Sequence, residues 1–263
     1  MNRSSVRFRP LAPLSFPNPP VSHQVFSIEE LSEYLHLEAD AIRLLVKRNE
    51  IPHERIGMGL RFRRKEIDRW ASQRLLGMSS DEVHDFHRQS SAKQHDLSAR
   101  HALLPEIMVP NCIEPELQGK TRAKIIRNMV DLADATGMLW DKEGLLAGVE
   151  ERENLCSTAL SGGVALLHPP QHEPYMFEDT FVVYGRTPAP ALFGGPDGRL
   201  TQHFFLLCAQ DDKIHLHLLA RLSMICHRTD VLLALTEAAS KGEMLDLLFA
   251  AEEEIIQSSL PRG

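Results

Sequence analysis

The 263-residue chain contains few cysteines, few aromatic residues and no long apolar run. Its cysteines, Cys112, Cys156, Cys208 and Cys226, form no Cys-x-x-Cys pair and lie among apolar residues. We therefore expect free thiols in a reducing cytoplasm, with neither disulfides nor a zinc site. No apolar run approaches the roughly 18–20 residues that cross a membrane, so we expect no membrane insertion. The length and the 43% hydrophobic content suffice for two modest cores.

Two polar segments flank the first candidate domain. Residues 1–23 contain five prolines that prevent regular structure, so this segment is expected to be disordered. The run from Val6 to Pro10 also matches a translated transfer-RNA arm, which suggests a start codon assigned too far upstream. Residues 77–102 are rich in Ser, Asp, Gln and His and predict a linker, with a short helix near 81–88.

Histidine is abundant, but its pattern predicts no metal site. Of the 13 histidines, His84, His87, His95 and His101 lie in the polar linker without thiol or regularly spaced acidic partners. The chain contains no other cluster with the spacing of metal ligands. We therefore expect neither a bound metal nor a cofactor.

Residues 24–76 have the pattern of a winged helix-turn-helix. Ser27-Ile28-Glu29-Glu30 is a capping box that opens a first helix, and a second helix is predicted from Ala39 to Arg48. Asn49 can end that helix in a left-handed conformation. Gly57-Met58-Gly59 then predicts a hairpin, and a third helix begins near Lys65.

This segment resembles the excisionase-type members of the MerR-like helix-turn-helix family. The residues that carry the match are Glu29, Glu30, Arg43, Lys47, Arg48, Ile51, Pro52, Arg61, Phe62, Arg63, Arg64 and Trp70. The resemblance implies DNA contacts from Arg43, Lys47 and Arg48 on the recognition helix. On the wing it implies contacts from Arg61, Arg63 and Arg64. The segment holds 10 Lys and Arg against 9 Asp and Glu, so a charged face on a protein-contact module is the alternative.

A second motif runs from Glu151 to His168. The apolar run Val164–Leu167 predicts a buried strand that delivers His168 at its end. Gly162 and Gly163 before it allow close backbone approach and leave N–H groups that suit an anion such as phosphate. A glycine turn that leads into a core strand with a structural histidine is the alternative.

This motif resembles the phosphorylation site of enzyme IIA of the mannitol, fructose and nitrogen type, from the bacterial sugar phosphotransferase system. The matching residues are Arg152, Glu153, Ser157, Thr158, Gly163, Ala165 and His168; the departures are Ser161, Gly162, Leu167 and Pro169. The resemblance covers about residues 103–256 and implies that His168 is the phosphoacceptor. It implies supporting roles for Arg152 and Thr158. It also places a second active-site histidine in a His-Leu-x-x-Leu pattern, which His215 fits, with His217 as the runner-up.

The expected fold is α/β: a winged helix-turn-helix followed by a mixed sheet flanked by helices. A helix at 121–136, a second one capped by Asp141, and closing helices at 232–239 and 243–254 are predicted. Asp197-Gly198 predicts a hairpin turn between a strand at Leu192-Phe193 and the apolar run from Phe204 to Cys208.

The expected function is a cytoplasmic bacterial regulator. The resemblance implies that an HPr-like phosphocarrier protein donates the phosphoryl group, with DNA and a second protomer as further expected partners. Two alternatives remain: a phosphocarrier that serves a separate sugar permease, and a non-phosphorylated protein-interaction module.

Overall fold

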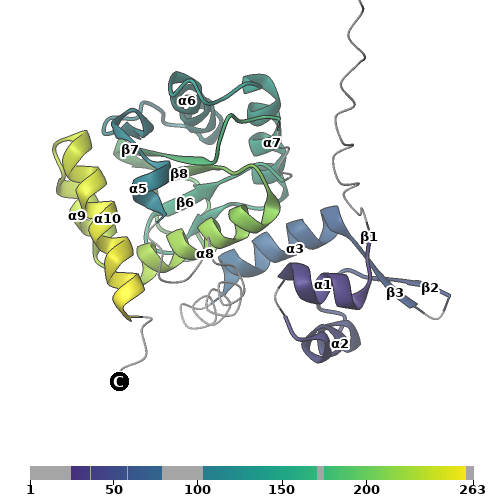
Figure 1. The fold of residues 1–263 in the computed structure, drawn as a ribbon. Coiled ribbons are helices and arrows are strands. Elements are labelled where there is room, and N and C mark those ends of the chain that lie inside the picture. The colour runs from purple at the N-terminus through teal and green to yellow at the C-terminus, as the bar shows by residue number, and fades with distance from the viewer. Residues whose placement is uncertain (1–24, 36, 58, 79–102, 171–174, 259–263) are drawn as a thin grey trace, which may run out of the picture.

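The computed structural model describes residues 25–35, 37–57, 59–78, 103–170 and 175–258. A helix-turn-helix unit and a larger α/β unit lie side by side in it (Figure 1). Residues 1–23, the predicted linker helix and the four linker histidines fall outside the described residues. No helix in the described ranges has the length and apolar character needed to span a bilayer.

The helix-turn-helix unit has three helices and a small antiparallel sheet. Its elements are β1 (Val25–Phe26), α1 (Ile28–Leu35), α2 (Ala39–Lys47), β2 (Glu54–Ile56), β3 (Gly59–Arg63) and α3 (Arg64–Gly77). The capping box is confirmed, because Glu30 N donates to Ser27 Oγ and Ser27 N donates to Glu30 Oε2. Asn49 has a φ of 56°, which confirms the left-handed end of α2. The strand β1, which pairs with β3, was not expected.

The α/β unit contains five strands and seven helical segments among the described residues. In chain order they are α5 (Leu104–Ile107), the 3-10 helix η1 (Pro110–Cys112), β4 (Ile113–Glu114), α6 (Arg122–Ala135), α7 (Lys142–Leu155), β5 (Ala159–Leu160), β6 (Val164–Leu167), β7 (Phe181–Ala191), β8 (Thr201–Cys208), α8 (Asp212–Arg228), α9 (Val231–Glu237) and α10 (Lys241–Ser258). Thr121 and Asp141 cap α6 and α7 through their side chains, as the sequence predicts for Asp141. The sheet order is β4-β7-β8-β6-β5, with both parallel and antiparallel pairs. The predicted mixed sheet flanked by helices is thus confirmed.

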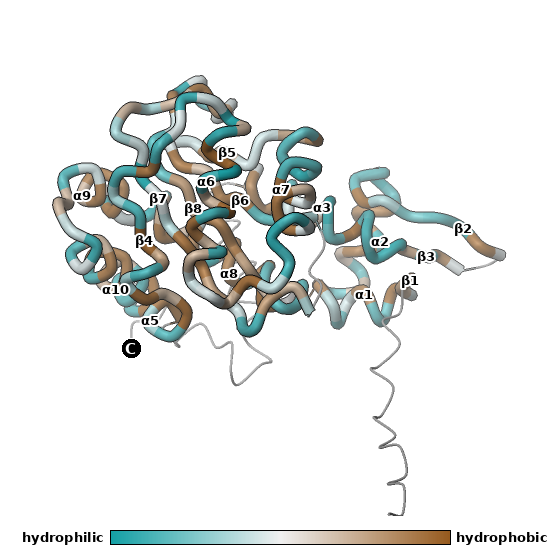
Figure 2. Tube along the Cα trace, turned by 90° about the horizontal axis from the view of Figure 1, so that it is seen from above, coloured by the Kyte–Doolittle hydropathy of each residue, from teal (hydrophilic) through white to brown (hydrophobic). Residues whose placement is uncertain are grey.

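Alternation along the strands divides the core into two layers. Ala165 and Leu167 of β6 pack with α6 and α7, whereas Val164 and Leu166 pack with α8 and α10. Figure 2 shows hydrophobic residues concentrated along β6 and β8. Because side chains alternate along a strand, residue 168 is the next position that faces α8.

The β7–β8 hairpin differs from the sequence expectation in its first strand. Gly198 has a φ of 71° in the connecting turn, as expected for a glycine there. However, the strand before it is Phe181–Ala191 and not Leu192–Phe193. The last residues of this strand include two prolines, which are unfavourable inside a sheet. The β7–β8 register shifts in the same region, between Arg186 and Ala191.

A buried ion pair joins α8 to α10 at the start of the α/β unit. Arg221 Nη1 donates to Glu252 Oε1 over 2.7 Å, and both side chains are fully buried. The two oxygens of Glu252 also accept the backbone N–H groups of Leu103 and Leu104. Desolvation lowers the pKa of Arg221, and the charge and hydrogen bond of Glu252 oppose this shift. The hydrogen bonds to Glu252 offset the cost of burying the two charges.

The two units meet where α3 packs against α8. Arg64, at the first residue of α3, forms an ion pair with Asp212, at the first residue of α8, with Nε 3.0 Å from Oδ2. Asp68, one turn along α3, accepts a 2.6 Å hydrogen bond from the Tyr34 hydroxyl. The Arg64 guanidinium also lies over the Tyr34 ring. Two carboxylates therefore share one cation at the contact.

This arrangement predicts a pH dependence of stability. Burial, aided by the charge of Asp212 and opposed by Tyr34 and Arg64, raises the pKa of Asp68 to about 7. The folded protein then holds a proton that the unfolded chain releases above about pH 4. The free energy of unfolding should fall as pH rises through this window, by at most about 1.4 kcal/mol per pH unit. Urea denaturation of wild type and Asp68→Asn at pH 5–8 should show this slope removed in the variant. Glu66→Gln, exposed on the same helix, should keep it, and identical slopes in wild type and Asp68→Asn would contradict the assignment.

Candidate functional site

His168 follows the last residue of β6 and turns toward α8. Its strand pairs in parallel with β8, so the histidine lies at the carboxyl edge of two adjacent parallel strands. The side chain is 1% exposed. The His215 ring of α8 lies 4.7 Å from it between ring centroids, with 44° between the ring planes. The structure therefore brings together the two histidines that the family pattern selects, although His217 is also buried nearby on α8.

Hydrogen bonds fix the tautomer of His168. Its Nδ1 lies 2.9 Å from the Leu166 carbonyl oxygen, which can only accept, so Nδ1 carries the proton. Arg152 Nε donates to Nε2 over 3.1 Å, so Nε2 presents its lone pair. The ring is therefore neutral, and its unprotonated Nε2 faces a guanidinium.

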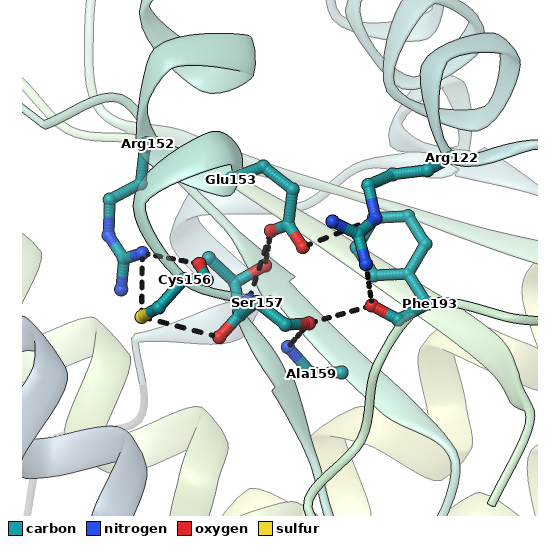
Figure 3. A network of polar contacts seen from close by, with 8 residues as sticks. Arg122, Arg152, Glu153, Cys156, Ser157, Ala159 and Phe193 are labelled. Atoms are coloured by element: carbon teal, nitrogen blue, oxygen red, sulfur yellow. Dashed lines mark hydrogen bonds and ion pairs between the residues drawn. The ribbon is translucent and has the colours of Figure 1, made fainter. Parts of the chain in front are cut away.

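Arg152 comes from the last turn of α7 and is 1% exposed. Its Nη1 donates to the Cys156 carbonyl oxygen over 2.9 Å and lies 3.5 Å from the Cys156 sulfur (Figure 3). Its Nη2 has no hydrogen-bond partner among the described residues. A buried cation with a spare donor, beside an imidazole lone pair, suits an anionic group on that imidazole.

A second network holds the segment after α7. Glu153 Oε2 accepts from both the backbone N–H and the hydroxyl of Thr158, over 2.9 and 2.7 Å. Arg122 Nε lies 3.7 Å from Glu153 Oε1, and its Nη2 donates to the Phe193 carbonyl oxygen (Figure 3). Burial raises the pKa of Glu153, and the Thr158 hydrogen bonds and Arg122 oppose this shift. Both donors of Thr158 are thus engaged by Glu153, which gives Thr158 a positioning role here; its contact with a phosphoryl group stays a prediction.

The glycine turn does not lie at the histidine, contrary to the sequence expectation. Gly162 and Gly163 precede β6, whereas His168 follows it, and four extended residues span about 13 Å. The Gly162 N–H donates to Asp197 Oδ2 over 2.9 Å. Gly163 has a φ of 85°, and an added Cβ would lie 3.0 Å from the Leu200 carbonyl oxygen. These glycines therefore form the turn that packs against the β7–β8 connection.

The basic residues of the helix-turn-helix divide into two groups. Lys47, Arg48 and Arg61 are exposed, and Arg43 and Arg63 form surface pairs with Asp40 and Glu54. Leu44, on the same helix as Lys47, is 47% exposed. Arg64 differs, because it turns away from the wing to Asp212 of the α/β unit. We therefore leave Arg64 out of the candidate DNA surface.

Sequence reasoning missed three residues around the site: Arg122, Asp212, and Cys156, whose carbonyl oxygen accepts a hydrogen bond from Arg152. Arg122 and Asp212 lie far from the motif in sequence, at the first residues of α6 and α8. Glu153 belongs to the motif, but its spacing to Thr158 gives no sign of the double hydrogen bond.

The fold and the site define a phosphotransferase-type α/β domain joined to a helix-turn-helix. The family model for the phosphoenolpyruvate-dependent sugar phosphotransferase system, EIIA 2, matches residues 106–251, and a helix-turn-helix domain model matches residues 25–75. The first match spans more than half of the chain, and the chain belongs to this EIIA family.

Several known proteins are similar to the α/β unit. The PTS system fructose-specific EIIABC component of Bacillus subtilis (strain 168) is 24% identical over 147 residues, which cover 55% of this chain and 23% of that protein. The chain therefore spans about a quarter of that relative's length. Two crystal structures are also similar. Nitrogen regulatory protein IIA-Ntr from Neisseria meningitidis has a TM-score of 0.46 and 22% identity, covering 56% of this chain and 99% of that one. IIA mannitol from Escherichia coli has a TM-score of 0.48 and 20% identity, covering 54% and 98%.

The Glu153–Thr158 contact predicts a stability effect with a matched control. Thr158→Val should lower the free energy of unfolding by about 1–3 kcal/mol. Valine has nearly the same shape as threonine, but it lacks the hydroxyl that donates to the buried carboxylate of Glu153. Thr201→Val is the control: Thr201 is fully buried, and its hydroxyl has no hydrogen-bond partner among the described residues. It should leave stability unchanged or raise it. Urea denaturation measures both, and equal losses in the two variants would count against the network.

Proposed function

We propose that this protein is a cytoplasmic regulator linked to the phosphotransferase system, in which His168 accepts a phosphoryl group from an HPr-like phosphocarrier. The observation that carries the proposal is the cluster of His168, His215 and Arg152. It combines a neutral imidazole with a defined lone pair, a second imidazole, and a buried cation whose Nη2 has no hydrogen-bond partner in the part of the chain that the structure describes.

The geometry supports a direct transfer. His168 Nε2 attacks the phosphorus of a phosphohistidine on the carrier; the new N–P bond forms as the carrier's N–P bond breaks, and the carrier nitrogen keeps that electron pair. The His168 Nδ1–H remains bonded to the Leu166 carbonyl oxygen, which stabilises the positive charge that develops on the ring. Such reactions depend on position and charge compensation more than on covalent help from the protein.

Arg152 and His215 compensate the charge in this scheme. Arg152 Nε gives up its bond to His168 Nε2 and, together with Nη2, donates to the phosphoryl oxygens. His215 donates to the same oxygens from the α8 side. Neither a metal nor a cofactor takes part in these steps.

The helix-turn-helix favours a regulatory role for the protein rather than a role in sugar transport. The exposed Lys47 and Arg48 of α2 and Arg61 of β3 form the proposed DNA surface, with Leu44 available to contact a thymine methyl group. Arg43 and Arg63 can exchange their exposed carboxylate partners for phosphates, because surface pairs contribute little. One near-neutral module makes few phosphate contacts, so we propose that two protomers bind paired half-sites. A phosphocarrier for a separate permease would use the same histidine chemistry without this surface.

The first test is phosphorylation. Incubation with phosphoenolpyruvate, enzyme I and HPr should label the protein with acid-labile phosphate, and His168→Ala should abolish the label. His215→Gln and Arg152→Lys should slow labelling by about 10²–10³-fold, because each removes a preorganised donor. His217→Ala is the matched control and should label like the wild type. Equal labelling of His168→Ala would falsify the acceptor, and no labelling of any form would favour a protein-interaction module.

The second test is DNA binding across a salt series. Lys47→Ala and Arg48→Ala should weaken binding and each reduce the salt slope by about one, because each removes one phosphate contact. Lys124→Ala removes an exposed charge from the α/β unit and should change neither quantity. Mobility shifts that detect no binding at low salt would remove DNA from the proposed function.

A further inference from the structure

The helix α3 touches the α/β unit at two points near the histidine site. At its first residue, Arg64 pairs with Asp212 of α8. Nine residues further on, Gln73 Nε2 lies 3.7 Å from the Cys156 sulfur. These residues are about 13.5 Å apart along the helix axis. The two contacts therefore fix both the position and the direction of α3.

The two contact points are linked to His168 through different residues, His215 and Arg152. Asp212 and His215 are three residues apart on α8 and share one helix face, and the His215 ring contacts His168. At the second contact point, the Cys156 carbonyl oxygen binds Arg152, which also donates to His168. The α3 helix thus runs from the contact linked to His215 to the contact linked to Arg152. Figure 1 shows α3 alongside α8.

The site is closed in this arrangement. His168, Arg152 and His215 are each 1–2% exposed. Transfer between histidines on two proteins requires the acceptor nitrogen and the donor phosphorus to approach in line, so a carrier needs access to His168 Nε2. Ile67, Ala71 and Leu75 of α3 are buried in one apolar cluster that includes residues of both α1 and α8.

From these observations we propose that α3 of the helix-turn-helix occupies the surface through which the phosphocarrier reaches His168, so that the two compete for it. This inference rests on the proposed function of His168. The helix-turn-helix undocks when the carrier binds, and a phosphoryl group on His168 keeps it undocked. By thermodynamic reciprocity, docking of α3 weakens carrier binding by the same factor by which carrier binding weakens docking. Whatever holds α3 on α8 therefore also slows phosphorylation.

The charges at the α3–α8 contact also favour undocking after phosphorylation. Asp68 and Asp212 both lie within ion-pair distance of the Arg64 guanidinium. A phosphoryl group on His168 adds nearly two negative charges beside the ring of His215, which lies one helical turn from Asp212 on α8. His168, Arg152 and His215 are buried in the docked form, so three phosphoryl oxygens on the ring favour the undocked form.

Charge reversal in the full-length protein tests the competition. Arg64→Asp should place a third carboxylate beside Asp68 and Asp212, open the contact, and raise the initial rate of labelling by phosphorylated HPr about tenfold, a usual size for coupling between two sites. Arg69→Asp makes the same change at an exposed position of α3 and is the matched control. The swap Arg64→Asp with Asp212→Arg should restore the slow rate.

Hydrogen exchange of the wild type provides an independent measurement if Arg64→Asp fails to fold. Amides of α3 and of the first turn of α8 should lose protection after phosphorylation, and His168→Ala treated in the same way should not. Equal labelling rates in wild type, Arg64→Asp and Arg69→Asp, or unchanged protection after phosphorylation, would overturn the inference. Absence of labelling in every form would instead contradict the proposed function itself.

Discussion

The hydrogen bond from Arg152 to His168 determines most of what the site can do. A guanidinium can only donate, so it requires a neutral imidazole with its lone pair on Nε2. The same guanidinium binds the carbonyl oxygen of Cys156, just beyond the end of α7, and so links that helix to the end of β6. Removing it would leave the Nε2 lone pair of His168 and the carbonyl oxygen of Cys156 without their donor. Chemistry and local architecture therefore depend on one side chain.

Around this bond, the sheet orients the His168 side chain, and the helices α7 and α8 provide the residues that contact it. Strand alternation turns His168 toward α8, where His215 stands one turn from Asp212. On the far side, Glu153 organises Thr158 while Arg122 holds both Glu153 and the Phe193 carbonyl oxygen. The site therefore joins three layers of the fold, which explains why its members lie so far apart in the chain.

The sequence predicted those features whose causes are local. The capping box at Ser27, the left-handed Asn49 and the strand Val164–Leu167 each follow from adjacent residues, and the structure has all three. Two features resisted prediction. The prolines near the end of β7 are unfavourable in a strand, so local sequence does not indicate one there. The pairing of this segment with β8 is decided by tertiary contacts. Arg64 stands in a basic run that fits a DNA-binding wing, and only its partner 148 residues away reveals its different contact.

The buried contact of Glu252 with Arg221 and the amides of Leu103 and Leu104 has a kinetic consequence. It anchors the chain at Leu103, where the described part of the α/β unit begins. In the proposed competition, a released helix-turn-helix would remain part of the same molecule as α8. Re-docking would then be a first-order event whose rate is independent of how much of the protein a cell contains. Carrier binding would depend on the amount of carrier, so the ratio of the two forms would follow the carrier and not the abundance of the protein itself.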